Sequence, residues 1–134
     1  MVEKKTAKLL EASAAIGALV ATGDDEPATA LARFGYNIGM AYQIQDDLLD
    51  ASAEEDVVGK SIGVDTINNR QTFLKLAYSN SIDVLVSEQD SKEQLSVLIR
   101  RYTRKANEAL RLLPPTPALQ YLTSLADSFV DRRC

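Results

Sequence analysis

Residues 39–50 decide how this chain is interpreted, and they run Gly39-Met40-Ala41-Tyr42-Gln43-Ile44-Gln45-Asp46-Asp47-Leu48-Leu49-Asp50. The stretch is typical of one continuous helix, in which Asp46 and Asp50 lie one turn apart (i, i+4) and Asp47 and Asp50 are also neighbours (i, i+3). Gln43 sits one turn back on the same side. Carboxylates so spaced repel each other by about 0.2–0.5 kcal/mol per pair. Because a hard divalent cation relieves this repulsion, the spacing indicates Mg²⁺ held by carboxylates together with substrate phosphates.

The surroundings of the aspartates favour a metal site over an ordinary solvated face. We expect their helix to begin after Gly23-Asp24-Asp25 and to end near Ala51, so the aspartates fall in its last turns, where the macrodipole disfavours negative charge. A local conflict of this kind is expected at functional sites. The flanking residues are apolar, so the carboxylates border a core and need partners: Tyr42, Ile44, Leu48 and Leu49.

The composition excludes several classes of function. The 134 residues allow one domain, 1–134, with enough apolar residues for a core. A formal net charge of -4 argues against nucleic-acid and membrane-surface binding. The absence of histidine excludes imidazole bases and His-ligated zinc, and the single cysteine, Cys134, favours a reducing cytoplasm. No apolar run approaches the roughly 20 residues that span a bilayer, so we expect a soluble chain.

The pattern along the chain predicts an all-α fold, a bundle of about five to six helices. Gly35 and Gly39 leave a smooth face on the aspartate helix for close approach of another helix. Ser91 begins a sequence that fits a capping box, and Thr116-Pro117 is suited to the start of the last helix. Helices are expected at 3–22, from a cap at Asp24 or Asp25 to about 51, at 66–79, at 91–113 and from 117 onward. Residues 80–91 are ambiguous, with 82–86 a short helix or an irregular apolar piece, and 53–64, which holds the acidic run 54–56, is expected to be a loop.

Three cationic positions are candidates for binding a phosphate. Lys5 and Thr6 at the start of the first helix offer an ammonium group and a hydroxyl donor. Lys60 follows Gly59 in the loop about ten residues beyond the aspartates. Arg70 begins the following helix and offers a bidentate guanidinium. Each of these cations, taken alone, is equally well explained as exposed surface charge.

Taken together, these residues resemble the trans-isoprenyl diphosphate synthases, or polyprenyl synthetases, which include farnesyl and geranylgeranyl diphosphate synthases. Residues 39–50 are similar to the family's second aspartate-rich motif, F-Q-x-x-D-D-x-x-D. Lys5-Thr6-Ala7 resembles its K-T-A, residues 59–65 its G-K-x-x-G-x-D, and residues 125–132 its C-terminal signature. Arg70 stands where a lysine is usual, which keeps the charge and changes the phosphate geometry.

The resemblance implies an enzyme, a prenyltransferase. The family sets product length near its first aspartate-rich motif, and here only Gln43-Ile44-Gln45 before Asp46 favours short-chain products of the farnesyl or geranylgeranyl type. In that reaction Mg²⁺ bridges the aspartates and an allylic diphosphate, the diphosphate leaves, and isopentenyl diphosphate attacks the allylic cation. Carried over, Asp46 is the main metal ligand, while Asp47 and Asp50 position metal-bound water and the neighbouring cations. The same resemblance makes catalytic and diphosphate-binding residues of Lys5, Thr6, Gln43 and Lys60, with Arg70 as a further substrate-binding residue.

The resemblance covers nearly the whole chain but only the C-terminal half of the family, whose first aspartate-rich motif lies upstream of K-T-A. We therefore expect the chain alone to be catalytically incompetent. Its expected partners are the two diphosphates, and either a second copy in a homo-oligomer such as a dimer or a missing N-terminal half. A half domain exposes apolar surface and self-associates.

Two other interpretations stay open. One is a non-catalytic helical subunit that regulates or completes a prenyltransferase partner, and such a subunit is expected to be monodisperse or to pair cleanly. The other is an unrelated helical interaction protein whose aspartates form a solvated face. Neutralising the three aspartates separates this last interpretation from a metal site.

Overall fold

The computed structural model describes residues 6–58 and 88–131, and within these ranges the side chains of 47, 50–58, 88–92 and 129–131 are not described. These residues contain helices and no strand, so the predicted all-α fold is confirmed. The helices are α1 (Lys8–Thr22), α2 (Asp25–Val58), α4 (Glu88–Leu110) and α5 (Pro117–Asp131). The predicted helix at 66–79 and residues 80–87 of the ambiguous stretch lie outside the described residues, whereas residues 88–91 of that stretch belong to α4. None of the described helices combines the length and the apolar composition needed to cross a membrane.

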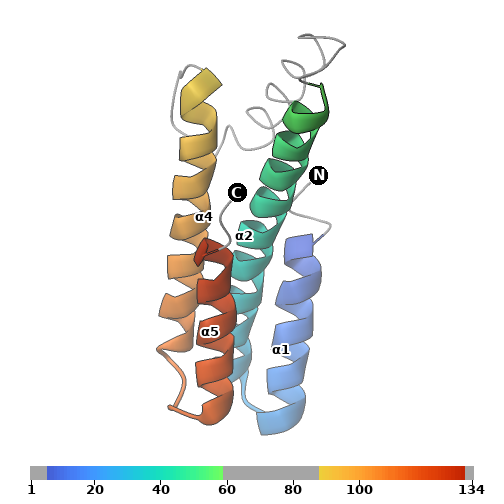
Figure 1. Cartoon of the computed structure of the whole chain (residues 1–134). Helices are drawn as coiled ribbons and strands as arrows, with labels where there is room; N and C mark the ends of the chain where they lie inside the picture. Colours follow the sequence, from blue (N-terminus) through green and yellow to red (C-terminus); the bar gives the residue numbers. More distant parts are fainter. Residues whose placement is uncertain (1–5, 59–87, 132–134) are drawn as a thin grey trace.

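The long helix α2 is the centre of the bundle, with α1 along one side and α4 along the other (Figure 1). Helix α5 packs against α4 and, less extensively, against α2. Among the described helices, α1 contacts α2 alone. Because the aspartate motif lies on α2, the packing of α1 and α4 on this helix determines what surrounds the motif.

Two groups of buried apolar side chains hold the bundle together, and α2 contributes to both. Along α2 the buried positions recur at helical spacing, as expected for a helix that packs on its neighbours. The first cluster joins α2, α4 and Ala7 just before α1, and consists of Ala7, Met40, Ala41, Ile44, Leu48, Leu95, Leu98 and Ile99. The second joins α2, α4 and α5, and consists of Phe34, Ile38, Ala106, Ala109, Leu110 and Ala126.

Helix α1 crosses α2 at Gly35 and Gly39, as the sequence predicts. A Cβ atom built on Gly35 would overlap the backbone carbonyl of Leu10, and one built on Gly39 would lie 2.6 Å from the Cα atom of Ala7. Carbon atoms that are not bonded to each other settle at about 3.5–4.0 Å. The two backbones are therefore in direct contact, which is the packing reason for two glycines inside a helix.

The predicted end of the aspartate helix is wrong. Helix α2 does not end near Ala51 but continues to Val58, through the acidic run 54–56 that was expected in a loop. Alanine and glutamate are strong helix formers, and no glycine or proline interrupts the helix before Gly59. Asp50 thus lies more than two turns before the end of α2. Since the helix dipole acts mainly within the last turn, it does not disfavour the aspartates, and the expected conflict between dipole and carboxylates is wrong.

Both predicted ends of the helix at 91–113 are wrong. Helix α4 begins at Glu88 and ends at Leu110, so Ser91 lies inside it and does not open a capping box. The last helix, in contrast, begins as predicted. The Thr116 hydroxyl oxygen accepts a hydrogen bond of 3.2 Å from the Leu119 N–H, and Pro117 is the first residue of α5. Gly23 ends α1 as predicted, with φ 72° and its N–H donating to the Leu19 carbonyl at 2.8 Å.

Candidate functional site

Two of the predicted site residues meet where the start of α1 lies against α2. The Thr6 hydroxyl donates a hydrogen bond of 2.9 Å to Oε1 of Gln43, and the contact is partly buried. These residues are 37 positions apart in the sequence, so the bond depends on the packing of α1 against α2. Sequence reasoning assigned both side chains to the same diphosphate but did not predict that they bond to each other.

The residues that follow Thr6 and Gln43 in the sequence belong to the first core cluster. Ala7 and Ile44, the residues that directly follow each partner, are both 0% exposed. Partial burial lowers the local dielectric constant, which strengthens a polar contact and raises the cost of breaking it. Thr6 and Ala7 also form a turn of the π type just before α1, a local geometry that is frequent at functional sites. The polar pair thus lies beside the packed contact of the two helices.

The three aspartates follow Gln43 on the same helix. At 1.5 Å of rise per residue, the Asp47 backbone stands about 6 Å beyond that of Gln43, and Asp50 lies nearly one turn further. The Asp46 side chain is exposed. The helical backbone therefore gives the predicted ligands the one-turn spacing that the sequence indicated, on the side of α2 that carries Gln43.

Among the described side chains, no three acidic groups lie together as a metal cage. This does not test the predicted magnesium site, because the side chains of Asp47 and Asp50 are outside the described set. The donor chemistry fits the ion, since an exposed carboxylate followed by two more within a helical turn offers the oxygen ligands that Mg²⁺ takes in proteins. Asp46, Asp47 and Asp50 remain the predicted metal ligands.

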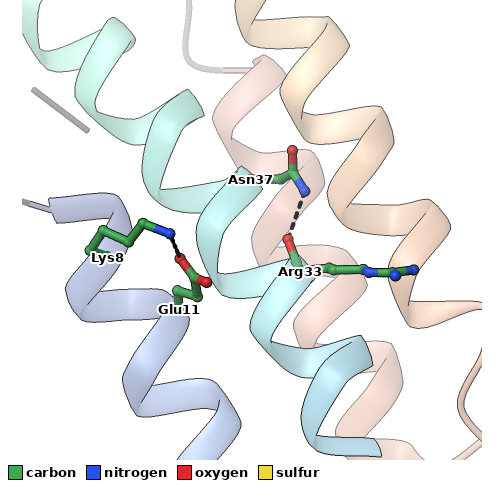
Figure 2. A network of polar contacts seen from close by, with 4 residues as sticks. All are labelled: Lys8, Glu11, Arg33 and Asn37. Atoms are coloured by element: carbon green, nitrogen blue, oxygen red, sulfur yellow. Dashed lines mark hydrogen bonds and ion pairs between the residues drawn. The ribbon is translucent and has the colours of Figure 1, made fainter. Parts of the chain in front are cut away.

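The predicted cations Lys5, Lys60 and Arg70 all lie outside the described residues. The described lysine nearest to them in sequence, Lys8, has other contacts: its ammonium group pairs with Glu11 at 2.6 Å and lies 5.0 Å from the centre of the Tyr36 ring. Figure 2 shows the pair of Lys8 and Glu11 on α1, beside α2. These contacts give Lys8 a place in helix packing, and we do not add it to the candidate phosphate-binding residues.

The other polar contact in Figure 2 lies on α2 itself. The Asn37 side-chain amide donates to the Arg33 carbonyl at 2.7 Å, one turn back along the helix. In the figure, the Arg33 side chain extends away from α1. The exposed guanidinium of Arg33 is therefore not part of the candidate site, which begins further along α2 at Gln43.

Comparison with known proteins places these features in a family. The family model described as polyprenyl synthetase matches residues 1–113. The chain is 38% identical to a geranylfarnesyl diphosphate synthase of Natronomonas pharaonis, over 98% of this chain and 44% of that protein. It is 34% identical to a geranylgeranyl diphosphate synthase of Methanosarcina mazei, over 98% of this chain and 38% of the relative.

A solved structure has the same fold. The crystal structure of geranylgeranyl pyrophosphate synthetase from Pyrococcus horikoshii matches with a TM-score of 0.70 and 34% sequence identity, over 99% of this chain and 48% of that one. The chain thus spans less than half the length of these relatives. The family model and the relatives agree with the resemblance of residues 39–50 and with the helical fold. The chain belongs to the polyprenyl synthetase family.

Proposed function

We propose that this chain forms the second aspartate-rich half-site of an isoprenyl diphosphate synthase. The reaction is the Mg²⁺-dependent, head-to-tail condensation of isopentenyl diphosphate with an allylic diphosphate. The observation that carries the proposal is the hydrogen bond between Thr6 and Gln43, which lies one helical turn before the aspartates in a member of this family. It brings Thr6, the middle residue of the sequence that resembles K-T-A, next to the helix that carries the aspartate motif.

The residues of this chain would divide the work by their chemistry. Lys5 and Lys60, with Arg70, would supply fixed positive charge to the diphosphate. The Gln43 amide would donate a hydrogen bond to it, and Thr6, whose hydroxyl proton goes to Gln43 Oε1, would hold that amide in place. Asp46, Asp47 and Asp50 would hold Mg²⁺. When bound, the metal supplies charge that stabilises the departing diphosphate. Donors held in place by a rigid helix pair stabilise the same developing charge without reorganising during the reaction.

The named relatives support the choice of substrate class. Both are prenyl diphosphate synthases, one named for geranylfarnesyl and one for geranylgeranyl diphosphate. We propose short-chain products for the whole enzyme and a reducing cytoplasm as its location. Residues 1–134 would form one helical domain that corresponds to the C-terminal half of the synthase. Because the chain spans less than half of these relatives, it is expected to make no prenyl diphosphate by itself.

Binding of an unreactive allylic diphosphate analogue tests the proposal. We expect calorimetry to detect binding in the presence of Mg²⁺ and none in its absence, because the carboxylates repel the diphosphate until a cation lies between them. The Asp46→Ala, Asp47→Ala double variant should lose at least about tenfold in affinity, since each lost charge-assisted contact contributes about 1.5–3 kcal/mol. Equal binding with and without Mg²⁺, or by the double variant, would contradict the metal-dependent half-site.

The outer face of α1 supports the proposal of a homo-oligomer. Leu9, Ile16 and Val20 recur on one side of α1 and are 67%, 61% and 82% exposed. Among the described residues only α2 packs on this helix, and it covers the opposite side. An apolar stripe of this kind favours association, because its burial contributes about 25 cal/mol per Å². We propose that a second copy of the chain covers it.

Sedimentation measures this association. The wild-type chain is expected to sediment as a dimer or larger species at micromolar concentration, and Val20→Glu to shift it toward the monomer by at least about tenfold in dissociation constant. Tyr121→Glu is the matched control, because Tyr121 is 77% exposed but lies on α5. A wild-type chain that stays monomeric, or a response to the control equal to that of Val20→Glu, would refute the assignment of this face.

A further inference from the structure

We propose that Gly35 and Gly39 are positioning residues for the candidate diphosphate site. They set the close approach of α1 to α2 at which the Thr6 hydroxyl reaches Gln43. The role in substrate binding rests on the proposed function, whereas the role in placing Thr6 rests on the packing alone. The proposal gives the two glycines a function beyond helix packing.

The contacts between α1 and α2 follow one another along α2 toward the candidate site. Leu10 meets Gly35, Ala7 meets Gly39, and Thr6 meets Gln43. On α2 these partners are spaced by four residues, so each lies about one helical turn beyond the last. The hydrogen bond is therefore the next contact in the row after the two glycines, at the point where α1 begins.

At Gly39 there is no room for even one methyl group. A Cβ atom there would lie 2.6 Å from Cα and 3.3 Å from Cβ of Ala7, and 3.2 Å from Cδ1 of Leu10. The leucine side chain is able to rotate away, but the backbone of Ala7 is not. Ala7 is 0% exposed and belongs to the first core cluster. To restore an ordinary carbon–carbon separation of about 3.5 Å, the start of α1 must withdraw by about 1 Å.

A withdrawal of this size removes the polar contact. Thr6 directly precedes Ala7 and moves with it, so the distance of 2.9 Å to Gln43 Oε1 would grow beyond the range of a hydrogen bond. The terminal torsion of a glutamine side chain has a broad range of allowed angles. Without the bond from Thr6, the Gln43 amide loses one of the contacts that fix its orientation. A displacement of about 1 Å in a binding site is enough to lower function by up to about 100-fold.

The chain supplies its own control. Gly17 lies within α1, and a Cβ atom built there would meet no heavy atom within 4 Å. Gly17→Ala therefore makes the same chemical change without disturbing the helix crossing, and it favours the helix. It also serves as a stabilised background in which Gly39→Ala stays folded if the single variant does not.

The experiment uses the full chain and two independent measurements. Nuclear Overhauser contacts between the Thr6 and Gln43 side chains report the crossing without any ligand. Calorimetry with the unreactive allylic diphosphate analogue and Mg²⁺ reports the site. The variants are Gly39→Ala, Thr6→Val, their combination and Gly17→Ala, each checked for wild-type helix content by circular dichroism, with Gly35→Ala as a second disturbance of the same crossing.

We expect Gly39→Ala to lose the Thr6–Gln43 contact and to weaken analogue binding about tenfold, as Thr6→Val does, with no further loss in the combination. Gly17→Ala should keep the Thr6–Gln43 contact and the wild-type affinity for the analogue. A folded Gly39→Ala chain that retains the contact overturns the proposal. Independent, multiplying losses in the combination also overturn it, because the glycine would then act by another route. If the wild type binds no analogue, the proposed function fails, and the side-chain contact alone decides whether the glycines place Thr6.

Discussion

Replacing Ile44 with alanine is expected to lower the free energy of unfolding by about 2–5 kcal/mol, since it removes three carbon atoms from a closely packed core. Ile44 is 0% exposed and lies in the first core cluster with Ala7 and Leu98. It also follows Gln43 directly. The same substitution should therefore weaken the Thr6–Gln43 contact, because the cavity lets the start of α1 and the adjoining turn of α2 shift. Urea unfolding followed by circular dichroism measures the change in stability.

Two controls separate the general loss of core from the local effect. Ile44→Val should cost only about 0.5–1.5 kcal/mol, because it removes a single methylene group. Leu110→Ala removes a side chain that is 2% exposed in the second cluster, between α2, α4 and α5. It should destabilise the chain as strongly as Ile44→Ala but leave the Thr6–Gln43 contact intact. An Ile44→Ala chain as stable as the wild type would show that the first cluster is not a packed core.

The fold was predictable from sequence where the signal is local. The all-α class follows from the spacing of apolar residues, and the start of α5 follows from the hydroxyl of Thr116 beside Pro117. The continuation of α2 to Val58 was missed because 53–64 was expected to be a loop, although residues 51–58 contain helix formers. The start of α4 at Glu88 was missed because the cap-like residue Ser91 also tolerates a helix interior.

In the candidate site, too, some features follow from the local sequence and others depend on tertiary packing. The positions of the aspartates along α2 follow from the period of a helix, which needs no tertiary information. The bond between Thr6 and Gln43 joins residues 37 positions apart, so it required the packing of α1 on α2. The sequence carried one signal for that packing, the pair Gly35 and Gly39, but not which residues of α1 would meet them. Lys5, Lys60 and Arg70 stay predictions, since they lie outside the described residues.

Neutralising the aspartates in Asp46→Asn, Asp47→Asn, Asp50→Asn is expected to stabilise the metal-free chain and to abolish its response to Mg²⁺. Each relieved repulsion at one-turn spacing contributes about 0.2–0.5 kcal/mol, so the gain should reach about 1 kcal/mol. In the wild type, Mg²⁺ at about 100 times its dissociation constant should add about 2.7 kcal/mol, because it binds only the folded chain. Thermal unfolding with and without magnesium chloride measures both effects.

The matched control for charge is Glu26→Gln, Glu93→Gln, Glu108→Gln, which replaces three exposed carboxylates elsewhere and changes the net charge from -4 to -1 in the same way. It should keep the full response to Mg²⁺. A metal-free aspartate variant no more stable than the wild type would remove the argument from repulsion. A retained Mg²⁺ response would assign the metal to other residues and favour the interpretation of the triplet as a solvated face. The two results are independent, because repulsion acts without metal and ligation acts only with it.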